Sequence, residues 1–195
     1  GELGYQPPEV ADVRVPDTVV HQDTSGGSLQ TLQGLAGSPA GFAAVWRDTR
    51  DGSLGLYFAR LDTDLVPIGS ERSICQPHTM RRTDAVVALG PTGRGAVAWT
   101  AVIGRGSVPF VHAFDATGFP QGGERMLSAP VVPTEDQPAR GGRGDDDASC
   151  REPALAVLSD GRLVLAWTRA GRVQWLATSP SGDPLAPAAE LDATL

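Results

Sequence analysis

Apolar residues along this chain fall in short runs, several of them alternating with polar residues, and clusters of glycine, proline, aspartate and serine separate the runs. Short alternating runs predict β-strands, and such clusters supply the turns that antiparallel strands need. No window keeps the spacing of three and four residues that an amphipathic helix requires. The pattern therefore predicts an all-β chain with many tight turns.

The order of runs and turns repeats. Trp46 and Trp99 lie 53 residues apart, and a shift by this distance also places Tyr57 on Phe110 without a gap. A third copy follows a longer connection, with Trp167 in the position of Trp99. Each copy contains four strand-like runs, and four antiparallel strands in a tandem unit are the pattern of a β-propeller blade.

We therefore predict a β-propeller-like fold of three four-stranded antiparallel blades, with an extra N-terminal edge strand in the stretch EVADVRVPDTVV. Three blades leave open blade edges, because a propeller ring needs more of them. The expected segments are residues 1–28 for the N-terminal part with its extra edge strand, 29–80 for blade 1, 81–132 for blade 2, 133–152 for an acidic, glycine-rich insertion loop and 153–195 for blade 3.

The stretch VWRDTRDGSLGLYFARLDTDLVPIGSE resembles the propeller-type repeats of bacterial exported and surface proteins. The resemblance spans about residues 29–192 and implies an extracellular, cell-surface or periplasmic location. The third copy departs from it, with Ser179-Pro180 where the first two copies have a Leu/Phe-Asp pair. A β-trefoil, which also has three repeats of four strands, is the alternative fold. Against it, the runs form an even meander and the Q-x-W signature of trefoil lectins is absent.

The formal net charge of -7 argues against nucleic acid or an anionic membrane surface as a partner. No stretch approaches the ~20 apolar residues that span a membrane. The two cysteines, Cys75 and Cys150, are too far apart in sequence for a metal-ligand motif. Both fall in polar connecting segments, which favours a disulfide over two reduced core thiols.

Acidic residues raise the question of a metal site. The loop after Trp46 contains Asp48 and Asp51, but the other two copies have no acid there, so a solvated turn is the first interpretation. A private calcium site using Asp48, Asp51 and the Ser53 hydroxyl is the alternative. In the insertion, Asp145, Asp146 and Asp147 could also coordinate a cation, although a simple surface loop explains them.

The aromatic residues share one register inside apolar strands, so we expect them to pack between units rather than to stack on sugars. We expect Trp175 to take the position of Tyr57 and Phe110, because the loop before it is about three residues shorter. The repeat core is predicted to contain Trp46, Trp99, Trp167, Tyr57, Phe110 and Trp175.

Catalytic motifs are missing: no G-x-S-x-G, phosphate-loop or H-E-x-x-H sequence occurs. We therefore expect no enzyme and no cofactor other than a possible calcium ion. The leading interpretation is a non-catalytic structural or protein-interaction module that binds protein partners or itself through its open blade edges. The alternatives are a lectin-like carbohydrate-binding module and a propeller glycosidase, but the loops DTRDGS, AVIGRGS and RAGR differ too much for repeated glycan sites.

Overall fold

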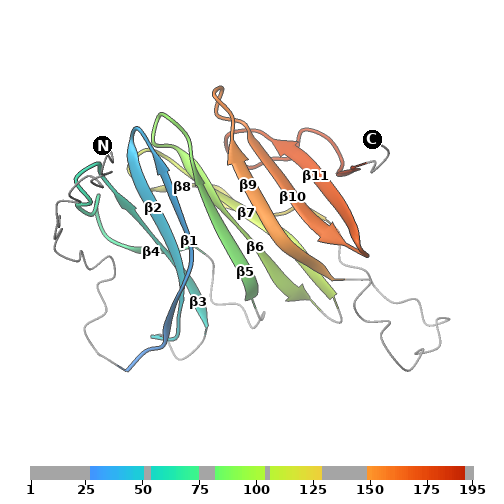
Figure 1. Cartoon of the computed structure of the whole chain (residues 1–195), viewed down its shortest axis with the longest axis horizontal. Helices are drawn as coiled ribbons and strands as arrows, with labels where there is room; N and C mark the ends of the chain where they lie inside the picture. The colour runs from blue at the N-terminus through green and yellow to red at the C-terminus, as the bar shows by residue number, and fades with distance from the viewer. Residues whose placement is uncertain (1–26, 51–53, 75–81, 104–105, 129–148, 192–195) are drawn as a thin grey trace, which may run out of the picture.

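The computed structural model describes residues 27–50, 54–74, 82–103, 106–128 and 149–191, and these form three four-stranded antiparallel sheets that stand side by side (Figure 1). In each sheet the strands follow one another in sequence order, as in a propeller blade. The predicted all-β fold of three four-stranded blades is thus confirmed. The predicted N-terminal strand, residues 9–20, lies outside the described residues.

The strands of blade 1 are β1 (Gln30–Ser38), β2 (Gly41–Asp48), β3 (Gly55–Leu61) and β4 (Arg72–Ser73). Those of blade 2 are β5 (Arg82–Leu89), β6 (Gly95–Ile103), β7 (Gly106–Phe114) and β8 (Pro120–Met126). Blade 3 consists of β9 (Cys150–Val157), β10 (Leu163–Arg169), β11 (Arg172–Thr178) and β12 (Ala189–Glu190).

The same turn follows the third strand of every blade. In blade 2 the Asp115 carboxylate accepts hydrogen bonds from the backbone N–H groups of Thr117 and Phe119, each at 2.9 Å. Asp62 makes the equivalent pair of bonds in blade 1. In blade 3 the Ser179 hydroxyl replaces the carboxylate and accepts the Asp183 N–H. Short polar side chains favour such turns because they satisfy backbone groups locally.

The core lies between the blades. One buried cluster joins blades 1 and 2 and contains Val45 and Phe58 of blade 1 with Trp99 of blade 2. A second cluster joins blades 2 and 3, with Ala98 and Val111 of blade 2 against Trp167 of blade 3. Successive residues of a strand point to opposite faces, so blade 2 supplies alternate side chains to the two clusters.

The two faces of a blade therefore differ. We call the face that carries the tryptophan of the second strand the tryptophan face, and the opposite one the rear face. In both interfaces the tryptophan face of one blade packs on the rear face of the blade before it, with Trp99 against blade 1 and Trp167 against blade 2. Each interface is thus directional.

Glycines in the repeated turn allow these faces to approach closely. Gly118 of blade 2 has a φ of 78°, and a Cβ built there would lie 2.8 Å from Cγ of Arg60 and 3.4 Å from the Phe58 ring, both on the rear face of blade 1. Gly182 of blade 3 has a φ of 89° and lies in the same way against Val111 of blade 2. Only glycine combines this backbone conformation with the available space.

No helix in the described ranges is long and apolar enough to cross a membrane.

Candidate functional site

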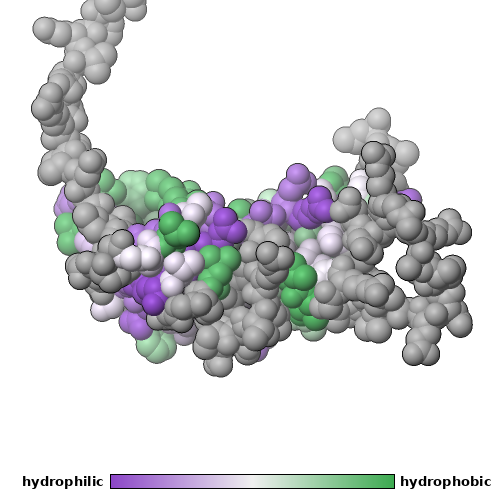
Figure 2. All heavy atoms as spheres, turned by 90° about the horizontal axis from the view of Figure 1, so that it is seen from below, coloured by the Kyte–Doolittle hydropathy of each residue, from purple (hydrophilic) through white to green (hydrophobic). Residues whose placement is uncertain are grey.

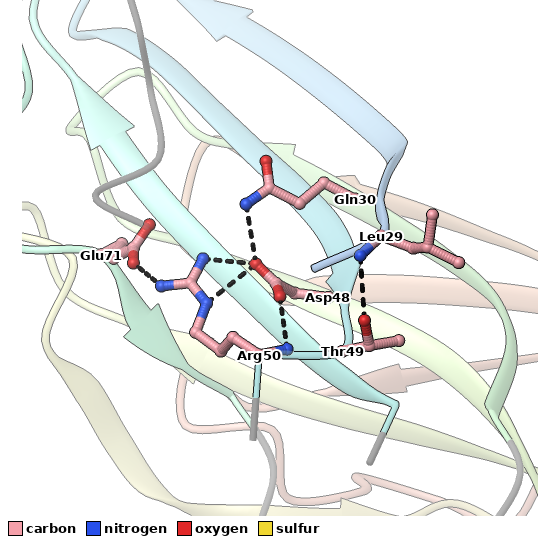
Figure 3. A network of polar contacts seen from close by, with 6 residues as sticks. All are labelled: Leu29, Gln30, Asp48, Thr49, Arg50 and Glu71. Atoms are coloured by element: carbon pink, nitrogen blue, oxygen red, sulfur yellow. Dashed lines mark hydrogen bonds and ion pairs between the residues drawn. The ribbon is translucent and has the colours of Figure 1, made fainter. Parts of the chain in front are cut away.

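A polar cluster at the end of blade 1 is built around Asp48, the last residue of β2, whose side chain is fully buried (Figure 3). Its carboxylate accepts hydrogen bonds from the backbone N–H and the Nε–H of Arg50, each at 2.8 Å. Gln30 of β1 donates a further bond at 3.1 Å. The hairpin loop thus folds Arg50 back over the end of its own strand.

Arg50 links this carboxylate to Glu71, the residue directly before β4. Its guanidinium forms ion pairs with both Asp48 and Glu71 (Figure 3). It also lies over the Tyr57 ring, with 4.2 Å between the guanidinium carbon and the ring centroid. Tyr57 in turn stacks on Trp46. These contacts join three strands of blade 1 on its tryptophan face, so the cluster stabilises the blade edge.

The interpretation of Asp48 as part of a solvated turn is therefore wrong. Burial alone disfavours its charged form, but the hydrogen bonds and positive charge of Arg50 outweigh that effect, so the pKa of Asp48 lies below its usual range. Both carboxylate oxygens accept hydrogen bonds from Arg50 and Gln30. The calcium site of Asp48 with Asp51 and Ser53 stays a prediction, because Asp51 and Ser53 lie outside the described residues. The missed signal was an arginine two residues after the aspartate.

The remaining metal candidates lie outside the described residues: Asp51, Ser53, Asp145, Asp146 and Asp147. Within the part of the chain that the structure describes, no group of three or more histidine, cysteine, aspartate or glutamate side chains is placed to hold a metal ion.

The repeated aromatic residues lie in the interior of the blades. Trp99 stacks on Phe110, with their ring centroids 5.6 Å apart, and both belong to the cluster between blades 1 and 2. Trp167 belongs to the cluster between blades 2 and 3. Trp46 and Tyr57 are also buried, on the tryptophan face of blade 1.

Trp175 is different, and its expected core position is wrong. Its side chain is 38% exposed, and it lies on the rear face of blade 3 rather than beside Trp167. The cross-strand partner of Trp167 is Gln174, whose Oε1 accepts a hydrogen bond from the Trp167 indole N–H at 3.1 Å. Gln174 thus occupies the position that Tyr57 and Phe110 have in the other blades.

The hairpin geometry explains this one-residue error. In blade 2, Ile103 pairs with Gly106, and in blade 3, Arg169 pairs with Arg172, so both hairpins close with two residues between the paired ends. Trp99 precedes its hairpin end by four residues, but Trp167 by two. When both strands of a hairpin are shortened equally, the number of residues lost is even, whereas the sequence alignment assumed that blade 3 had lost three residues. An odd error moves a side chain to the other face of a sheet.

Arginines of the fourth strand reach from one blade to the next. Arg72 of β4 lies over the ring of Phe119, which belongs to the repeated turn of blade 2, at 4.9 Å. Arg125 of β8 forms an ion pair of 2.7 Å with Asp183 in the repeated turn of blade 3. We had interpreted the recurring Glu-Arg pairs only as a charged edge that discourages aggregation. Their arginines also connect neighbouring blades.

Cys150 is buried in the core between blades 2 and 3 as a free thiol. The expected disulfide is therefore not formed at Cys150, and Cys75 lies outside the described residues. The sequence suggested a polar connecting segment, but β9 begins at Cys150, whose carbonyl accepts a hydrogen bond from the Ser107 hydroxyl of blade 2 at 2.5 Å. The thiol itself lies among the apolar residues of the cluster between blades 2 and 3.

Burial raises the pKa of the Cys150 thiol, which lowers the fraction of reactive thiolate. In a Cys75→Ser variant, where Cys150 is the remaining cysteine, we expect no reaction with Ellman's reagent in the native protein. Full reaction is expected once the protein is unfolded in denaturant. Stoichiometric labelling of the native variant within minutes would contradict the buried position of Cys150.

Exposed apolar side chains occur at both ends of the row of blades. On the tryptophan face of blade 1, Leu32 and Leu35 are 64% and 65% exposed. At the other end, Trp175 and Val173 of β11 are exposed, and so is Leu191 after β12. Figure 2 shows hydrophobic side chains, coloured green, reaching the surface at separate places on the face seen there.

Comparison with known proteins finds only distant structural similarity. No family model matches the chain, and no curated protein matches it. A solved structure described as belonging to the GH130 family of mannoside phosphorylases, which contains glycoside hydrolases acting on Candida mannan, is 11% identical with a TM-score of 0.42. The match covers 85% of this chain and 49% of that one.

Two further solved structures are similar at the same level. Prolyl oligopeptidase B from Galerina marginata is 15% identical with a TM-score of 0.42, over 89% of this chain and 20% of that one. A putative glycoside hydrolase from Bacteroides ovatus is 12% identical with a TM-score of 0.41, over 77% and 47% of the two chains. This chain therefore spans about half or less of these proteins.

Proposed function

We propose that this chain is a non-catalytic structural or protein-interaction module that binds through the open faces of its end blades. The supporting observation is the position of the exposed apolar side chains. Trp175 and Leu191 lie at one end, on a sheet face whose equivalents inside the molecule are covered by a neighbouring blade. At the other end Leu32 and Leu35 are exposed on the first strand of blade 1, beside Trp46 and Tyr57, which are buried. Exposed apolar sheet faces mark association surfaces.

The polar side chains support the same proposal. Asp48, Arg50 and Glu71 bind one another at the edge of blade 1, and Arg72 and Arg125 connect neighbouring blades. The first group stabilises the edge of its own blade, and the two arginines hold neighbouring blades together. Export to the cell surface is part of the proposal and rests on the resemblance of the sequence repeats to those of exported bacterial proteins.

The proposal is tested by oxidative footprinting with hydroxyl radicals, in dilute purified protein and in the cells that produce it. Oxidation of Trp175 is expected to fall in the cells relative to oxidation of Met126, which is exposed on the central blade. The ratio falls because a partner covers the end face and leaves the central blade open. An unchanged ratio of Trp175 to Met126 oxidation would show that the end face binds nothing and would refute the proposed function.

A further inference from the structure

We draw no further inference here: the strongest candidate, the exposed apolar patch around Trp175 and Leu191 on the rear face of blade 3, carries nothing because nothing in the structure shows what covers it.

Discussion

Replacing Trp99 with alanine is expected to lower the free energy of unfolding by about 3–5 kcal/mol, the usual cost of removing a buried tryptophan. Trp99 is 1% exposed, stacks on Phe110 and lies in the middle of the cluster that joins blades 1 and 2. The cluster lies between two β-sheets, and a sheet cannot collapse into the cavity as a flexible loop could. The measurement is urea unfolding followed by far-UV circular dichroism.

The matched control is Met126→Ala, which removes an exposed apolar side chain from the same blade. We expect it to change the free energy of unfolding by less than about 0.5 kcal/mol. Trp99→Phe keeps an aromatic ring and should fall between the two. A loss below about 1 kcal/mol for Trp99→Ala would mean that the interface between blades 1 and 2 is not packed as described.

Replacing Asp48 with alanine is expected to cost about 3 kcal/mol, because it leaves the Arg50 guanidinium without its buried carboxylate. The pH dependence has a definite sign. The pKa of Asp48 is lower in the folded protein than in the unfolded chain, so its contribution is present above the unfolded value of about 3.9 and is lost as the pH falls through the folded pKa. The difference in unfolding free energy between wild type and Asp48→Asn should therefore shrink as the pH falls below about 4.

The control for Asp48 is Glu190→Gln, whose ion pair with Arg172 is exposed on blade 3. Exposed pairs contribute little, so this variant should follow wild type at every pH. Unfolding curves at a series of pH values between 2 and 7 measure both effects. If wild type and Asp48→Asn differ by the same amount at pH 2 and pH 7, the Asp48–Arg50 contact is not the source of the stability.

The repeat was the part of the fold that the sequence could reveal. Strand number, strand order and the position of the repeated turn follow from local patterns, and the Trp46–Tyr57 and Trp99–Phe110 pairs follow from an ungapped alignment. The Trp167–Gln174 pair could not be obtained this way, because the hairpin that joins these two strands is shorter than in the other blades. The sequence shows that the hairpin is shorter, but it does not show which two residues pair where the hairpin closes. A single residue of uncertainty then reverses the face of Trp175.

The arrangement around Asp48 was hidden for a different reason. The other two copies have no acid in this loop, so repetition suggested a solvated turn. Burial of Asp48 depends on Arg50 folding back over it and on the contact of Arg50 with Glu71, which lies directly before β4 and 21 residues after Arg50. Contacts between side chains of distant strands leave no periodic signal. The arginines that connect neighbouring blades were visible in the sequence as the recurring Glu-Arg pair. Their function was not visible, because the residues that they contact lie in the next blade.

The fourth strand of blade 3 has one further physical consequence. Ala189 pairs with Trp175 at the ladder position that Arg72 and Arg125 hold in the other blades, so in blade 3 this position carries no cation to hold the turn of a neighbour. We therefore expect association at this face to depend on apolar contact. Raising the ionic strength screens ion pairs, and salts such as sulfate strengthen apolar association. A complex formed at blade 3 should therefore hold or tighten at high salt, where a complex built on surface ion pairs would dissociate.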